Sequence, residues 1–247
     1  MSNLFYNLGR GLGRATMPAV QKVRWGWNAV LGSEDDRIRA EKSMGRTLAM
    51  EFRAKIEGHA DPQDAALVSG LCQQLAARVK NKLLSFSAEV VRLPEPTALA
   101  LPGGFIFVSL PLLDLCHRYT DELAFVLGHE MAHVIRGHAA DRLLHDSALN
   151  LAARVAGRAG PLGTWLRGAG LQMLASAYSQ DCEFEADELG SRLADAAGYP
   201  PLASVRLFQR LQALHQNQTP LGQYFSSHPT PAERIAQMGR LWRPRQA

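Results

Sequence analysis

Cysteine is scarce in this sequence and never appears in a closely spaced pair. The three cysteines are Cys72, Cys116 and Cys182, and no Cys-x-x-Cys motif occurs. An odd number of widely spaced cysteines argues against a disulfide framework and favours a reducing compartment. We therefore expect all three side chains to serve as small apolar residues of a core.

A long uninterrupted hydrophobic run is also missing. The apolar stretch 148–177 is broken by Pro161 and by three arginines, whereas a membrane-spanning helix needs about 20 consecutive apolar residues. Residues 1–16 contain glycine and arginine where a secretory signal would have its apolar segment. The sequence thus predicts no signal peptide and no clear transmembrane helix, and we expect a protein that is cytoplasmic or peripheral on a membrane surface.

Acidic residues are absent before Glu34, although the first 33 residues hold four basic ones. Five apolar residues of this segment share one face at helical spacing: Val20, Val23, Trp27, Val30 and Leu31. Residues 1–33 are therefore predicted to form a basic amphipathic extension. Such a helix can lie on an anionic membrane surface. Its apolar stripe can equally pack against the rest of the chain or a partner subunit. The composition also resembles an organellar transit peptide, although serine is scarce, and the sequence leaves these alternatives open.

Charge elsewhere gives little guidance on partners. The net charge is +4, which is a mild excess of positive charge for 247 residues. No basic run with interleaved aromatic residues occurs, so we do not expect nucleic-acid binding.

Hydrophobic periodicity predicts an α+β fold that is mainly helical with one small sheet. Helical spacing recurs in 34–58, 61–79, 121–137, 180–197, 201–216 and 231–242, and β-forming stretches occur at 85–93, 97–101 and 105–110. Thr120 is the expected N-cap of the helix over 121–137. With 47% hydrophobic residues the chain can bury one sizeable core. We expect a single domain over residues 34–242 and a short tail at 243–247.

One helical segment carries a chemical motif, the HExxH sequence at residues 129–133. His129 and His133 are four residues apart, so they project from one helical face and can bind the same ion. In this motif the histidines bind Zn²⁺, and the glutamate, here Glu130, is the general base that activates the attacking water. The flanking residues are apolar, so the helix is expected to be buried, where its polar side chains need partners.

A catalytic zinc needs a third protein ligand and one open coordination position. Glu183 and Asp187 are four residues apart on a second helix. Glu183 is the predicted third ligand. Asp187 is predicted to accept a hydrogen bond from the free ring nitrogen of a ligand histidine, for which His129 is the candidate. We thus expect one Zn²⁺ per chain.

Three other titratable residues near these motifs are expected to lie outside the site. Glu185 and Glu188 are interpreted as members of a solvated helix face. His138 follows His133 by five residues, which turns it away from the ligand face of a continuous helix.

These motifs resemble those of the HtpX-type zinc metallopeptidases, which include the CAAX prenyl protease and a stress-activated protease of the mitochondrial inner membrane. The family pattern is HExxH followed by ExxAD, and Glu183 and Asp187 match the glutamate and aspartate of its second part. The Pro-Gly-Gly strand at 101–108 and the Ser-x-His-Pro segment at 226–229 also resemble the family. The resemblance covers about 33–242 and is closest to soluble or membrane-attached bacterial relatives of the mitochondrial member. The family often has arginine where Gln180 stands, so this chain lacks one positive charge near Asp187.

The resemblance implies a zinc-dependent endopeptidase of the gluzincin type that cleaves misfolded or membrane-associated proteins, as in protein quality control. His228, in the Ser-x-His-Pro segment, would either stabilise the oxyanion of the reaction or cap the zinc. The strand after the two glycines is expected at the edge of the sheet, where an extended substrate could pair with it. The predicted substrate-binding residues are Gly103, Gly104, Phe105, Ile106 and Phe107. The alternative is a chaperone-like or partner-binding module with a latent zinc site.

Overall fold

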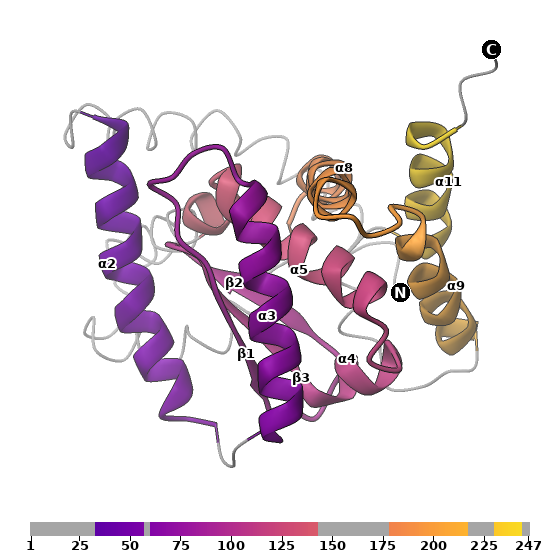
Figure 1. Cartoon of the computed structure of the whole chain (residues 1–247), viewed down its shortest axis with the longest axis horizontal. Coiled ribbons are helices and arrows are strands. Elements are labelled where there is room, and N and C mark those ends of the chain that lie inside the picture. Colours follow the sequence, from indigo (N-terminus) through magenta and orange to yellow (C-terminus); the bar gives the residue numbers. More distant parts are fainter. Residues whose placement is uncertain (1–32, 57–59, 143–177, 217–229, 244–247) are drawn as a thin grey trace, which may run out of the picture.

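The computed structural model describes residues 33–56, 60–142, 178–216 and 230–243. The amphipathic extension and His228 lie outside the described residues. The elements are α2 (Glu34–Arg53), α3 (Pro62–Arg78), β1 (Ser87–Val91), β2 (Ala98–Leu101), β3 (Phe105–Ser109), α4 (Leu110–Leu115), α5 (Thr120–Ile135), α8 (Gln180–Ala196), α9 (Ala203–Gln216) and α11 (Pro231–Leu241). The predicted α+β fold, mainly helical with one small sheet, is confirmed (Figure 1).

Most helices begin where the sequence provides a cap. The Ser33 side chain accepts a hydrogen bond from a backbone amide in the first turn of α2. At α3, Asp61 is the N-cap and Pro62 is the first helical residue. Ser179 caps α8, and Thr230 with Glu233 forms a reciprocal capping box at α11.

The predicted N-cap of α5 is wrong. Thr120 is the first helical residue, and Tyr119 stands at the cap without a side-chain hydrogen bond. The start of this helix is fixed by tertiary contacts instead, because the fully buried Glu122 forms an ion pair with Arg206 of α9 at 3.3 Å. The helix also ends at Ile135, two residues before Gly137, whose φ is +79°.

The sheet has the order β1-β3-β2, with β3 in the centre. β3 pairs in parallel with β1 and antiparallel with β2. The prediction that β3 is an edge strand is therefore wrong, because neighbours on both sides use its backbone groups. Ile106, Phe107 and Val108 of β3 are each only 1% exposed, so both faces of this strand are covered. Among the described strands, β2 is the edge strand that pairs antiparallel.

The two glycines before β3 lie close to the backbone of neighbouring segments. A Cβ atom on Gly104 would lie 1.9 Å from the carbonyl oxygen of Ser85, and one on Gly103 would lie 2.4 Å from Cα of Lys42. Both glycines have positive φ, so the turn needs residues without side chains. The turn packs against the backbone of α2 and of residue 85.

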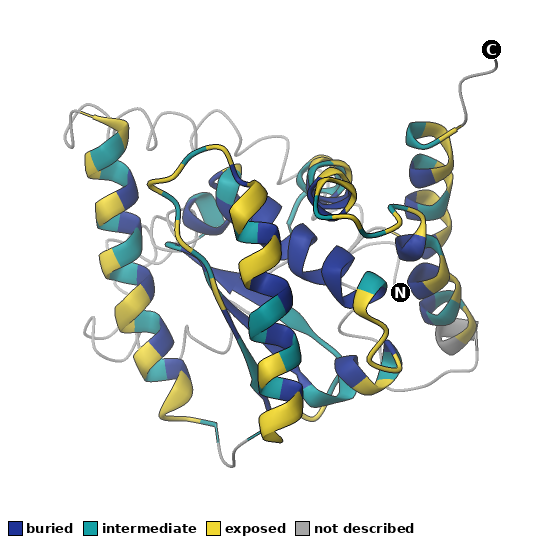
Figure 2. Cartoon of the chain, in the orientation of Figure 1, coloured by how far each residue is buried: buried dark blue, intermediate teal, exposed yellow. Residues whose placement is uncertain are grey.

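The sheet lies between two helical layers (Figure 1). On one face Phe52 of α2 packs with Leu99, Leu101 and Phe107. The opposite face contributes Ala88, Ala100, Ile106 and Val108 to the main core, which also contains residues of α3, α5, α9 and α11. Figure 2 shows that α5 is buried along almost its entire length.

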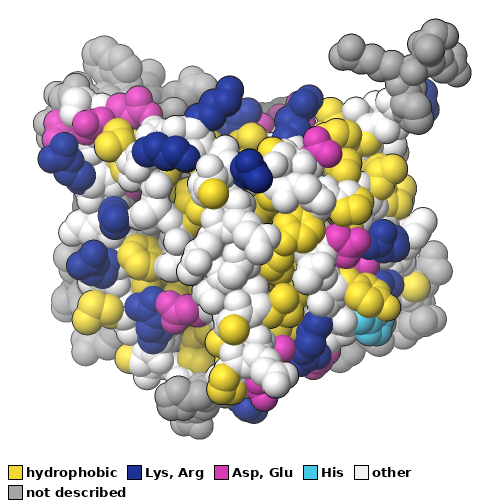
Figure 3. Space-filling view, viewed as in Figure 1, with side chains coloured by type: hydrophobic (Ala, Val, Ile, Leu, Met, Phe, Trp, Pro, Cys, Tyr) yellow, Lys and Arg dark blue, Asp and Glu magenta, His cyan; other side chains and the backbone are white. Residues whose placement is uncertain are grey.

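The surface beside α2 and α3 carries basic and acidic side chains interspersed, and a band of apolar side chains runs next to α3 (Figure 3). Within the described residues, none of the helices combines the length and the hydropathy needed to cross a bilayer. All three cysteines are free, and burial raises the pKa of Cys72 to about 11, so its thiol stays protonated at neutral pH.

Helices α5 and α8 approach each other until their backbones touch. A Cβ atom on Gly128 would lie 2.6 Å from the carbonyl oxygen of Gly190, and one on Gly190 would lie 2.6 Å from the amide nitrogen of His129. Only glycine fits at either position without moving a helix. This contact sets α8 directly beside the two histidines of α5.

We predict that Gly190→Ala destabilises the fold by about 1–3 kcal/mol, because the new methyl group overlaps backbone that cannot rotate away. Gly70→Ala is the matched control. Gly70 is also helical, but a Cβ atom added to it would have nothing within 4 Å, so that change should stabilise by about 0.5–1 kcal/mol. Urea denaturation measures both. Equal free energies of unfolding for the two variants would contradict the close contact.

Candidate metal centre

Three side chains from α5 and α8 bring their donor atoms together. The Nε2 atoms of His129 and His133 are 3.1 Å apart. Glu183 places Oε2 3.5 Å from the first of these atoms and Oε1 3.4 Å from the second. The histidines lie on one face of α5 and the glutamate lies in the first turn of α8. All three are buried, the most exposed being His129 at 5%.

This donor set fits a zinc ion. Tetrahedral Zn²⁺ with bonds of about 2.0–2.1 Å holds its ligand atoms about 3.3–3.4 Å apart. The two imidazole nitrogens are 3.1 Å apart, and each lies 3.4 or 3.5 Å from a different oxygen of the Glu183 carboxylate, which is close to that value. Two imidazoles with one carboxylate are also a donor combination that zinc enzymes use. The ligand atoms lie within 4.8 Å of one another, as one bound ion requires.

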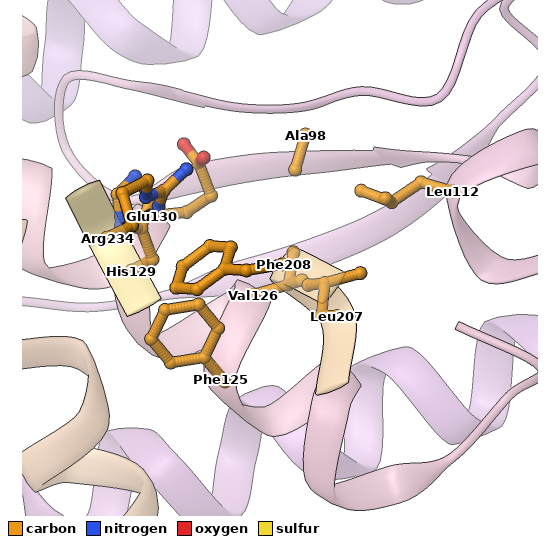
Figure 4. Close-up of a pocket in the computed structure, with 9 residues that line it drawn as sticks. All are labelled: Ala98, Leu112, Phe125, Val126, His129, Glu130, Leu207, Phe208 and Arg234. Carbon is orange, nitrogen blue, oxygen red and sulfur yellow. Dashed lines mark hydrogen bonds between the residues drawn. The ribbon is translucent and has the colours of Figure 1, made fainter. Parts of the chain in front are cut away.

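Glu130 and one of the three candidate ligands, His129, line a common pocket. The other lining residues are Ala98, Leu112, Phe125, Val126, Leu207, Phe208 and Arg234. Figure 4 shows His129, Glu130 and Arg234 gathered at one end, with Ala98 and Leu112 towards the other and the rings of Phe125 and Phe208 close together. The polar side chains thus meet an apolar wall, which suits an apolar group placed next to the reacting atoms.

The far nitrogen of His129 is held by a carboxylate. Its Nδ1 lies 2.9 Å from Oδ1 of Asp187. Arg234 of α11 donates to the same carboxylate through Nε at 2.8 Å and Nη2 at 2.5 Å. The guanidinium also lies over the ring of Phe208. Arg234 therefore supplies the positive charge that the sequence lacks at Gln180. Gln180 belongs to α8, whereas Arg234 belongs to α11.

These contacts set the charges around His129. Burial alone would lower the pKa of His129, but its interactions with Asp187 and Glu183 raise that pKa to about 9. Burial would raise the pKa of Asp187, yet Arg234 and His129 hold it below its usual value. A metal ion that binds His129 at neutral pH must consequently displace a proton.

The surroundings of His133 differ from the sequence-based expectation. His138 is buried, and its Nδ1 lies 3.1 Å from Nδ1 of His133. Its Nε2 lies 3.3 Å from Oε2 of Glu185, so Glu185 is not simply a solvated residue. His138 follows the end of α5 and is not among the three grouped donor residues, as expected. The unexpected feature is its contact with His133, which arises because the chain turns at Gly137.

Two more contacts complete this side of the site. The ring of Tyr178 stacks on His133 at 3.9 Å between ring centroids and 15° between planes. Burial and the neighbouring His133 lower the pKa of His138 to about 4, so this ring is neutral near pH 7. Sequence reasoning missed Arg234, Tyr178 and His138, and only Arg234 had a signal, the Glu-Arg-Ile sequence that follows the Ser-x-His-Pro segment.

A helix that carries HExxH, packed against a second helix whose glutamate reaches the two histidines, defines a zincin-type metallopeptidase domain. The chain belongs to peptidase family M48, whose profile matches residues 62–241. The resemblance noted from the motifs is thereby confirmed.

The relatives described below carry one of two names. The chain is 33% identical over 181 residues to the mitochondrial metalloendopeptidase OMA1 of Schizosaccharomyces pombe, covering 72% of this chain and 52% of that protein. It is 30% identical over 210 residues to the mitochondrial metalloendopeptidase OMA1 of Danio rerio, covering 77% and 43%. The beta-barrel assembly-enhancing protease of Yersinia pestis is 28% identical over 218 residues, covering 81% and 43%. The chain spans about half the length of these relatives.

We predict that Arg234→Met lowers the free energy of unfolding of the metal-free protein by about 3–5 kcal/mol, because Asp187 remains buried without its cationic partner. Arg192→Met is the control. Arg192 also pairs with an acidic residue of α8, Glu188, but at the exposed surface, so its loss should cost less than about 1 kcal/mol. Chemical denaturation after chelator treatment compares the free energies of unfolding of the two variants. Similar losses of stability in both would show that Arg234 is not needed beside Asp187.

Proposed function

We propose that this chain is a zinc-dependent endopeptidase. His129, His133 and Glu183 would hold one Zn²⁺, and Glu130 would be the general base. The observation that carries the proposal is the convergence of two imidazole nitrogens, 3.1 Å apart, with the Glu183 carboxylate, whose oxygens Oε2 and Oε1 lie 3.5 Å from His129 and 3.4 Å from His133. Glu130 lines a pocket together with His129.

The residues divide the chemistry between them. When bound, the ion polarises the scissile carbonyl and makes the attacking water more acidic. Glu130 takes a proton from that water and then delivers it to the leaving amine. Asp187 accepts a hydrogen bond from Nδ1 of His129. The other ring nitrogen of His129, Nε2, is then left to face the metal site. The apolar wall of Phe125, Phe208 and their neighbours limits the entry of bulk water.

We further propose that an extended substrate pairs with β2 rather than with β3. The amide of Ser109 donates to the carbonyl of Thr97 at 2.8 Å. Backbone groups alternate in direction along an antiparallel strand, so those of Ala98 and Ala100 point away from β3 towards the outer edge. Ala98 also lines the pocket with Glu130. A peptide on this edge would pass directly beside the metal site.

The proposed substrates are segments of misfolded or membrane-associated proteins, which matches protein quality control. One support is that pairing with β2 requires an extended chain. The other is the names of the relatives, because one group is called mitochondrial and the other is called beta-barrel assembly-enhancing. We propose that residues 34–242 form the peptidase domain, because α2 packs on the same sheet as the matched region. The basic segment 1–33 would add peripheral contact with a membrane, and His228 would face the cleft.

We predict that Glu130→Gln keeps about one zinc per chain and lowers casein hydrolysis at least about 100-fold, because the amide cannot accept the proton. Metal analysis and a proteolysis assay, each with and without chelator, make the comparison. Glu188→Gln is the control, since Glu188 lies at the exposed surface and pairs with Arg192. Casein cleavage by Glu130→Gln at the wild-type rate would contradict the proposal that Glu130 is the general base of an endopeptidase. Bound zinc without chelator-sensitive cleavage by the wild-type chain would favour the chaperone-like alternative.

We predict that Ala98→Pro lowers peptide cleavage about tenfold without changing zinc content, because proline removes one N–H that the substrate would use. The first position of an edge strand tolerates proline, so the melting temperature should change little. Ala98→Val adds similar bulk to the pocket and keeps the N–H. Equal cleavage by the two variants would mean that substrate does not pair with β2 at this residue.

A further inference from the structure

We propose that His138 and Glu185 are positioning residues for the metal ligand His133, joined to it in a hydrogen-bond relay that fixes its tautomer and ring orientation. The inference rests on the proposed metal site, and it adds two residues that the HExxH and ExxAD motifs do not assign. Neither residue is proposed to touch substrate.

The relay is continuous from the buried site to the surface. His133 Nδ1 lies 3.1 Å from His138 Nδ1, and His138 Nε2 lies 3.3 Å from Glu185 Oε2. Arg136 holds the other oxygen of Glu185 through Nε at 3.1 Å. The side chain of His133 is fully buried, whereas that of Glu185 is 45% exposed.

Proton positions along the relay allow one arrangement when a metal is bound. Nε2 of His133 faces His129 and Glu183, so it must be free of its proton to act as a ligand. The single proton of the neutral ring then sits on Nδ1, which donates to His138 Nδ1. His138 must accept at that atom, so it carries its own proton on Nε2 and donates to the Glu185 carboxylate. Reversing the direction would put a proton on the metal-binding nitrogen of His133.

The two ligand histidines are thus held by different means. His129 has a carboxylate directly at Nδ1, because Asp187 lies on the facing side of α8. On its Nδ1 side, His133 is connected to the Glu185 carboxylate through the ring of His138. Tyr178, stacked on the ring of His133 at 3.9 Å, adds a constraint on the ring plane. Contacts of this kind strengthen a metal ligand by ordering it before the ion binds.

The test measures the zinc dissociation constant by competition with a chromophoric chelator. We expect His138→Leu to bind zinc about 10–100-fold more weakly, because Nδ1 of His133 loses its acceptor. His138→Asn keeps an oxygen near the position of the lost Nδ1 and should remain within about fivefold of the wild type. The visible spectrum of the cobalt-substituted protein should change for leucine and stay close to wild type for asparagine. Melting of the metal-free proteins separates these effects from folding.

A second pair of variants covers the case in which His138→Leu does not fold. Glu185→Ala should weaken zinc binding about threefold or more. Glu188→Ala changes a similarly exposed glutamate of the same helix that pairs with Arg192 instead, and it should leave zinc binding unchanged. Equal zinc affinities for this pair, or equal losses for the leucine and asparagine variants, would overturn the relay. Tight zinc binding by a wild-type chain that does not cleave casein would reject the proposed function and leave the relay standing.

Discussion

The backbone contact between α5 and α8 is the constraint on which the site depends. Gly128 and Gly190 let the two helices come close enough for a side chain at either position to collide with backbone at 2.6 Å. A carboxylate has a short reach, so Glu183 can stand 3.4 Å from His133 only when α8 lies this near to α5. Separating the helices by the width of a methyl group would move the Glu183 carboxylate away from the two imidazoles.

Burying this much polarity is possible because the charged groups are paired. Asp187 is fully buried, but it accepts hydrogen bonds from two nitrogens of Arg234 and contacts the ring of His129. Such pairing lowers the cost of burying a charge. Arg234 comes from α11, far along the chain from the metal ligands, so the last helix of the domain contributes to the order of the site. The remaining walls of the pocket are apolar, and they leave Glu130 as the acidic group that lines it.

Local patterns in the sequence were enough to predict the longer helices, the α+β class and the three side chains whose donor atoms converge, His129, His133 and Glu183. Spacing of four residues places His129 with His133, and Glu183 with Asp187, whatever the rest of the fold does. Strand order was not predictable in this way, because the apolar run 105–109 fits a central strand as well as an edge strand, and only the described pairing places it between β1 and β2. The contribution of His138 depended on where α5 ends, and that of Arg234 on how α11 packs; neither is a local property.

The central claim is that two imidazoles and one carboxylate surround a single zinc ion. X-ray absorption spectroscopy of the zinc-loaded chain tests it most directly. The account predicts only nitrogen and oxygen neighbours at about 2.0–2.1 Å, and a loss of one equivalent of bound zinc in Glu183→Ala. A sulfur neighbour at about 2.3 Å would implicate Cys182, which precedes Glu183 in the sequence, and would contradict the proposed ligand set.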